Sequence, residues 1–455
     1  MRVSKLKSSW IYEHSHRLDS SPYMTGAIES KDMLKSCDLN MSLVKDITSS
    51  IYKGKMLKRT FVRDKNFGTK FLTTTGMQRL DSKYVPLLAN SLARMDKGCF
   101  VKPGMTLISA AGTIGNLAYV RKDMEGDFAC GDILKITAKD IPSGYLYAFF
   151  KSRFGIPLVI QGTYGSIVQH LDGKQLENIS VPRLNEKIEI EIHGHIEKAA
   201  NSRAEANDLI SRAISIYEAE VGTVNGEKVT SFSTGVVSSK ALVRLDAQYY
   251  SEPAINAEIK HQQFDSRKLS EVSDVFTPGI FKRPYVDEAK YGYPYYSGTE
   301  VFLTTPTPRG YLNKKAPNIQ NYVVQKDWLL IQDAGQLGGL IGQVMRVSDV
   351  LDKSVVSNHL MRIKPRSKEI GAYLFAALSS ETGYTSIVRN AFGSSIPQLD
   401  PKHIAKISIP WLPADEFNKI VDLVSAAWDL QDFARHSEEI AVNKIESTIF
   451  KYASS

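Results

Sequence analysis

The 455-residue sequence has little cysteine and no long apolar run. Its three cysteines, Cys37, Cys99 and Cys130, are odd in number, lie in the first half and show no C-x-x-C spacing. This favours reduced, buried thiols and excludes both a disulfide framework and a zinc site. No run approaches the roughly 18–20 apolar residues of a membrane span, and residues 1–10 are too polar and basic for a signal peptide. We therefore expect a cytoplasmic protein that holds no metal.

Several catalytic motifs are also missing. An adenine methyltransferase is expected to carry N-P-P-[FY] and a glycine-rich cofactor loop, and neither occurs; an A-G-x-[IL]-G loop occurs twice but lacks G-x-G-x-x-G spacing. His193 and His195 would lie on different faces of a helix, so they form no helical metal pair. A nuclease-like pattern, Asp274 with E-A-K at 288–290, has a spacing that arises often by chance. A non-catalytic chain is predicted; the alternative is a DNA-modifying enzyme or nuclease with divergent motifs.

What the sequence does contain is a long repeat. Residues 144–184 return as residues 372–412 without a gap, and roughly a third of the paired positions are identical, which is far above chance. The offset is always 228, so that Leu171 corresponds to Leu399. The chain is therefore predicted to be a tandem duplication, in keeping with the two to four domains that its length allows.

Further shared pieces precede each copy of this repeat. They are R-L-D at 17–19 and 244–246, apolar alternation at 41–47 and 269–275, and strand-to-loop segments at 71–76 and 295–300 and at 101–115 and 324–338. Such runs, ending in glycine and small hydroxyl residues, predict strands. We expect a first strand-rich domain over residues 1–184, a helix over 185–221, a linker over 222–240, a second strand-rich domain over 241–412 and a second helix over 413–455.

Each helical stretch carries a narrow apolar stripe. The stripe positions are Ile188, Ile192, Ile196, Ala199, Ala206, Ile210, Ala213 and Tyr217, and then Phe417, Ile420, Val424, Ala427, Phe433, Ile440, Ile445 and Ile449. A narrow stripe suits packing against one partner helix, as in a coiled coil. Both stretches hold eight acidic and four basic residues, so we expect them to bind protein and not phosphates.

Positive charge is concentrated in the first unit. The net charge is +8, yet residues 52–102 alone hold twelve Lys and Arg against three Asp. A local excess of this kind is typical of proteins that bind the phosphate backbone of nucleic acids. A merely soluble basic face is the alternative.

The duplication, the G-S-x4-L-D…I-S-[VI]-P element, the R-L-D-x3-Y stretches and the helix after each unit together resemble one family, the specificity (S) subunits of type I restriction–modification systems. The resemblance implies an α+β fold with two target recognition domains, each reading one half of a split DNA sequence, and two long helices that pair as an antiparallel coiled coil. It implies docking of two adenine-specific methyltransferase subunits, which would bring S-adenosylmethionine, while this chain itself binds no cofactor. A restriction or translocase subunit is a further implied partner, and a related phage-defence system that uses such a subunit stays open.

Base reading requires amide, hydroxyl and guanidinium groups on loops, because these match the edges of the bases in the major groove. In the first unit we expect base contacts from Thr73, Thr74, Thr75, Gln78, Arg79, Thr113, Tyr164 and Ser166. In the second unit we expect them from Ser297, Thr299, Arg309, Gln332, Gln336, Asn390, Ser394 and Ser395. Phosphate contacts are expected from Lys55, Lys58, Arg59, Lys65, Lys282 and Arg283. For each of them the alternative is an ordinary surface loop residue, whereas Leu171, Leu399, Ile179 and Ile407 are expected in the core.

Overall fold

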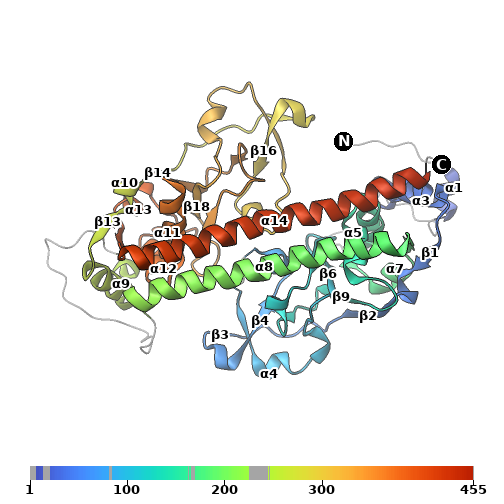
Figure 1. Cartoon of the computed structure of the whole chain (residues 1–455), viewed down its shortest axis with the longest axis horizontal. Coiled ribbons are helices and arrows are strands. Elements are labelled where there is room, and N and C mark those ends of the chain that lie inside the picture. The colour runs from blue at the N-terminus through green and yellow to red at the C-terminus, as the bar shows by residue number, and fades with distance from the viewer. Residues whose placement is uncertain are drawn as a thin grey trace. The chain divides into compact units, whose positions relative to one another are not determined.

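The computed structural model describes residues 7–13, 21–80, 85–161, 163–164, 170–224, 244 and 246–453. The chain divides into two compact units, Met1–Ala204 with Phe433–Ser455, and Glu205–Asp432. Each unit includes a part of both long helices, α8 (Glu186–Val221) and α14 (Ala414–Ala453), which Figure 1 draws in green and red.

The first unit is built on two four-stranded sheets. One is antiparallel, with the order β2 (Thr48–Lys53), β9 (Ile133–Ala138), β6 (Thr106–Ser109) and β7 (Leu117–Tyr119). The other has the order β3 (Phe61–Val62), β5 (Leu87–Ala89), β4 (Gly68–Leu72) and β8 (Phe128–Ala129), in which β4 and β8 are parallel. A short pair, β1 (Met41–Leu43) with β12 (Ser180–Pro182), completes the scaffold beside the helices α3 (Ala27–Ser36), α5 (Ser143–Lys151), α6 (Gly155–Gln161) and α7 (Gly173–Glu177).

The second unit repeats the two four-stranded sheets and the short strand pair of the first unit. The first unit also has the pair β10 (Thr163–Tyr164) and β11 (His170–Leu171), to which an isolated bridge between Phe392 and Gln398 corresponds in the second unit. Its antiparallel sheet has the order β14 (Ser273–Phe276), β21 (Leu360–Pro365), β18 (Leu329–Gln332) and β19 (Val344–Arg346). Its mixed sheet has the order β15 (Tyr285–Val286), β17 (Gly310–Asn313), β16 (Gly292–Tyr296) and β20 (Val355–Val356). The unit also contains the pair β13 (Ser266–Lys268) and β22 (Ser408–Pro410), with the helices α9 (Glu252–Gln262), α10 (Leu269–Val272), α11 (Lys368–Ser379), α12 (Glu381–Val388) and α13 (Pro401–Ile404). The duplication predicted from the sequence is thus confirmed in the fold.

The repeated segment makes the same internal hydrogen bonds in both units. The Tyr145 hydroxyl donates to the carbonyl of Pro182, and the Tyr373 hydroxyl donates to that of Pro410 at 2.7 Å. Asp172 and Asp400 cap the short helices α7 and α13 by accepting from backbone N–H groups, which satisfies otherwise unpaired donors. The four aliphatic residues expected in the core are all buried: Leu171, Leu399, Ile179 and Ile407.

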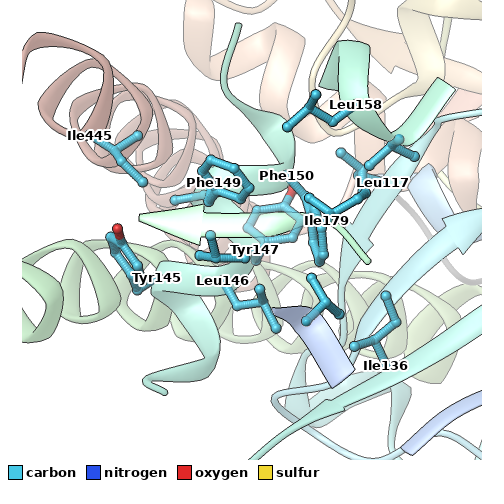
Figure 2. Packing of buried hydrophobic residues seen from close by; sticks show 14 of the residues in the cluster. Leu117, Ile136, Tyr145, Leu146, Tyr147, Phe149, Phe150, Leu158, Ile179 and Ile445 are labelled. Carbon is cyan, nitrogen blue, oxygen red and sulfur yellow. The ribbon is translucent and has the colours of Figure 1, made fainter. Parts of the chain in front are cut away.

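Helix α5 carries much of the first core. Figure 2 shows Tyr145, Leu146, Phe149 and Phe150 from this helix, and the same cluster also includes Leu117, Ile136, Leu158, Ile179 and, from α14, Ile445. Burying aromatic and aliphatic side chains of this size stabilises a fold by about 1.5–3 kcal/mol each, so α5 holds the sheet onto the helix pair.

The long helices are antiparallel within the first unit. The Ser437 hydroxyl donates to the His195 carbonyl at 2.9 Å, and Glu191, earlier on α8, pairs with Lys444, later on α14. In the second unit the end of α8 shares a core with the beginning of α14. Most stripe positions are buried or half-buried, but Phe433 and Ile440 are about half exposed, so their assignment to the stripe was wrong. Small residues, Ala434 and Ala441, are buried in their place and let the helices approach closely.

One buried ionic cluster joins this helix pair to α5. Glu438 accepts hydrogen bonds from Tyr147 at 2.6 Å, from Lys151 and from Arg203. Burial raises the pKa of Glu438, but the two cations and the tyrosine outweigh it and hold that pKa well below its usual value. At the offset of 228, the second unit has only uncharged residues at these places: Phe375, Ser379, Ile210 and Gln431.

Candidate nucleic-acid interface

A basic and aromatic segment leads into the mixed sheet of each unit. Residues 56–62 read M-L-K-R-T-F-V and residues 280–286 read I-F-K-R-P-Y-V, an offset of 224. The segments end in β3 and β15, which occupy the same edge of equivalent sheets. The duplication has therefore kept a Lys-Arg pair at the same place in both units. All six side chains predicted to bind phosphates are exposed: Lys55, Lys58, Arg59, Lys65, Lys282 and Arg283.

The arginine of each pair rests on an equivalent ring. The Arg59 guanidinium lies 5.5 Å from the ring centroid of Phe71, and that of Arg283 lies 5.2 Å from the ring centroid of Tyr295. A ring face attracts the cation and restricts its movement while its N–H groups stay available to an anion. Arg59 also lies 3.8 Å from Asp132, a long and half-exposed ion pair that contributes little stability.

Exposed apolar side chains flank these cations. Ile280 is 90% exposed and Met56, its counterpart, is 68% exposed; Tyr285 and Phe61 are also a matching exposed pair. The sequence-based prediction missed these four residues. The signal that could have found them is the alignment at offset 224, which places them at equal distances from the Lys-Arg pair.

In the second unit, three predicted base-contact residues gather around one carboxylate. Arg309 donates from Nε to Oε2 of Glu300 at 3.0 Å and from Nη2 to Oε1 at 2.9 Å, and Ser297 donates to Oε2 from its backbone N–H at 2.9 Å and from its hydroxyl. Burial alone would raise the pKa of Glu300, but these hydrogen bonds outweigh it and lower that pKa. Thr299 is exposed beside them, and Glu300 itself was missing from the predicted set.

The first unit places its predicted residues differently. Thr73, Thr74 and Thr75 are half-buried, and the Thr73 hydroxyl accepts from the backbone N–H of Gly76 at 2.9 Å, which forms a turn. Gln78 and Arg79 are half-buried too, and the Gln78 amide donates to the Leu117 carbonyl at 3.0 Å.

Of the three remaining predicted residues of the first unit, the structure describes the side chain of Thr113. Thr113 is exposed and follows Gly112. The φ of Gly112 is 74°, a left-handed backbone conformation that favours glycine at this position. Ser166 and the side chain of Tyr164 lie outside the described residues. The predicted base contacts of the first unit therefore stay predictions.

A second group of predicted residues in the second unit joins two loops. Gln336, Ser394 and Ser395 are exposed, and the Gln336 amide donates to the Ser395 carbonyl at 2.9 Å. Gln332 and Asn390 are buried, and their amides donate to the carbonyls of Ala334 and Ser386, both at 2.9 Å. These two buried side chains therefore hydrogen-bond to the backbone of their own segments. The prediction that they contact bases is untested.

Gln332 also links the two groups. A Cβ atom built on Gly298 would come 2.2 Å from the Gln332 side-chain oxygen, so the loop of Ser297 and Glu300 passes directly over that side chain. A side chain at position 298 would therefore require the buried Gln332 side chain to move. The Gln332 side chain thus lies between the loop of Ser297 and Glu300 and the segment that leads to Gln336.

Two other kinds of site, metal centres and membrane spans, have a recognisable geometry. Over the described ranges, no three His, Cys, Asp or Glu side chains are grouped so that they could hold a metal ion. In the part of the chain that the structure describes, no helix combines the length and apolar character needed to cross a membrane.

Comparison with known proteins bears on the second unit above all. Residues 262–436 match the family model described as the type I restriction modification DNA specificity domain. The match confirms the resemblance that the sequence indicates, and the first unit shares the same order of strands. No curated protein is a significant match to the sequence.

Several solved structures are similar over most of the chain. The S subunit of a type I restriction–modification system from M. genitalium is 13% identical, with 92% of this chain and 96% of that chain covered and a TM-score of 0.35. The HsdS subunit from Thermoanaerobacter tengcongensis is 15% identical, with 91% and 96% covered and a TM-score of 0.27. A chain from a structure of type I R-M complex assembly and conformational transition is 16% identical, with 91% and 97% covered and a TM-score of 0.27.

Proposed function

We propose that this chain, whose residues 262–436 match the type I restriction modification DNA specificity domain, is the DNA-recognition subunit of a type I restriction–modification complex or of a related phage-defence complex. Each unit reads one half of a bipartite DNA target. The observation that carries the proposal is a duplicated scaffold that keeps Lys58-Arg59 and Lys282-Arg283 at one place and changes the polar residues around it. Constant cations suit the phosphates common to all DNA, and varied polar loops suit two different base sequences.

The chemistry belongs to partners in this proposal. The chain is a non-catalytic specificity subunit, and adenine-specific methyltransferase subunits, two in number, supply S-adenosylmethionine and transfer the methyl group. The acidic faces of α8 and α14 favour protein partners over phosphates, so these helices are the docking elements. A restriction or translocase subunit joins the complex where the system cleaves DNA.

Methylation mapping tests this proposal directly. When the chain is co-expressed with its partner adenine methyltransferase, the methylated sites are expected to share a bipartite motif with an unspecified centre. Sequencing that detects modified bases genome-wide measures this, and cells with the methyltransferase alone serve as the control. A contiguous motif, or the same sites without the chain, would refute the proposal.

The long helices are expected to set the gap between the two half-sites. One extra heptad placed between Ala204 and Glu205, and one between Asp432 and Phe433, falls at the boundary of the compact units and keeps every residue of both. The insertion adds about 10 Å of helix, which is the length of about three base pairs.

Mapping of the modified sites should then show a longer gap with both half-sites unchanged. A heptad in α8 alone is the control, since it leaves the two helices unequal and should abolish methylation. An unchanged gap in the doubly extended chain would contradict the role of the helices as a spacer.

A further inference from the structure

We propose that Arg309 reads a guanine in the half-site of the second unit, and that Glu300 is the positioning residue that fixes its guanidinium. The inference rests on the function proposed above, and it adds the identity of one base and of the two residues that select it.

The carboxylate of Glu300 is held from two sides. Glu300 begins the short turn η8 (Glu300–Phe302) after β16, and Arg309 directly precedes β17. Ser297 donates two hydrogen bonds to Glu300, and Arg309 donates two more along its Nε–Nη2 edge. With four donors, the carboxylate can hold the arginine in one orientation.

The guanidinium group of Arg309 has N–H donors that do not bind Glu300. Its side chain is 55% exposed although that of Glu300 is only 17% exposed, and in the described ranges Nη1 of Arg309 donates no hydrogen bond to the protein. Nη1 and the second hydrogen of Nη2 form a planar pair of donors. Guanine presents two acceptors, O6 and N7, side by side in the major groove, whereas adenine pairs an acceptor with a donor, cytosine presents a donor and thymine a single acceptor. Two parallel donors therefore select guanine.

Arg309 also lies close to a residue that is suited to bind the DNA backbone. Its backbone N–H donates to the carbonyl of Tyr295 at 2.8 Å, and the Arg283 guanidinium lies over the ring of the same Tyr295. The next residue, Gly310, lies so close to the ring of Tyr285 that a Cβ would come 2.9 Å from it. Arg283, which is suited to bind phosphate, and Arg309, which is suited to bind a base edge, thus both contact Tyr295. The first would anchor the protein on DNA while the second reads the base.

The fold does not need this ion pair. The equivalent strands of the first unit have Val85 at the place of Arg309 and Gly76 at the place of Glu300, yet they form the same sheet with the same register. A pair that only one copy of a duplicated scaffold carries, and that the scaffold does not require, fits a difference in the DNA that is read.

The test uses the full chain, co-expressed with its methyltransferase, as wild type, Arg309→Ala and Glu300→Gln. The wild-type motif is expected to hold an essential guanine in one half-site, and Arg309→Ala should relax that position alone, with a loss of discrimination of roughly 10- to 100-fold. Glu300→Gln should relax the same position less, because the amide still offers one acceptor to Arg309. Lys402→Ala, at an exposed lysine on α13, is the matched control and should leave the motif unchanged.

A duplex with 7-deazaguanine at the mapped position separates reading from a structural role. This base lacks the N7 acceptor, so the wild-type complex should bind it more weakly than guanine, while Arg309→Ala should bind both duplexes equally. Equal sensitivity of the two proteins, or a motif in which Arg309→Ala relaxes no guanine, would overturn the inference. If the wild type itself yields no bipartite motif, the proposed function fails and the inference fails with it.

Discussion

Glu438→Ala is expected to lower the free energy of unfolding by about 3–5 kcal/mol, because it leaves the buried Arg203 and the half-buried Lys151 without their partner. Glu438 is 3% exposed and accepts from Arg203, Lys151 and Tyr147. Removal of one member of a buried ionic cluster lowers the free energy of unfolding by more than the intact cluster adds to it, because the remaining charges stay shielded from water without a partner. Urea unfolding followed by circular dichroism measures the change.

The neighbouring residue provides a matched control. Glu439 is itself 48% exposed and pairs with Arg435 one turn earlier on the same helix, so Glu439→Ala should lower the free energy of unfolding by no more than about 1 kcal/mol. If both substitutions have equally small effects, Glu438 does not hold the first unit to α14 in the way that its contacts indicate.

The same cluster predicts how stability depends on pH. The pKa of Glu438 lies well below its usual value of 4.5, because the hydrogen bonds and charges of its partners outweigh the effect of burial. A carboxyl group with a lowered pKa contributes stability above its unfolded-state pKa, and that contribution disappears as pH falls below about 4.5. Unfolding measured on the acid side should therefore show a steeper loss of stability in the wild type than in Glu438→Gln. Equal slopes would count against the lowered pKa.

Neutralisation of both Lys-Arg pairs should produce the largest loss of DNA affinity. With alanine at Lys58, Arg59, Lys282 and Arg283, affinity for a duplex that carries the mapped target is expected to fall about 100-fold or more at physiological salt. The reason is that each protein–phosphate interaction releases condensed counterions. The slope of log affinity against log salt should therefore shrink by about one for each cation that no longer binds a phosphate.

Fluorescence anisotropy over a salt series measures both quantities. Because the pairs occupy equivalent places, each double variant should produce about half of the change in slope, with no change of the motif. The control removes four exposed lysines on other elements, Lys122, Lys139, Lys402 and Lys406. A control whose affinity falls as far would show that net charge alone is responsible.

Much of the architecture was predictable because each helix or strand has its own local residue pattern, and because the pattern of each unit occurs twice in the chain. The offset of 228 identified the duplication, and the apolar stripes placed the helices at 185–221 and 413–455, close to the observed α8 and α14. Side-chain periodicity depends only on the geometry of one element, and a repeated motif such as that of Leu171 and Leu399 marks a position that both copies must bury.

The tertiary structure decided which polar residues meet. Nothing in the sequence distinguishes the exposed Gln336 from the buried Gln332, because Gln332 is covered by the loop of Gly298, and Gln336 contacts a second loop that is distant in the chain. The stripe likewise misplaced Phe433 and Ile440, since the close approach of α8 selects the small residues beside them. The pairing of Glu300 with Arg309 and that of Glu438 with Arg203 have no sequence pattern at all. Periodicity and repetition specify elements, whereas a contact between charges arises only when separate elements have packed together.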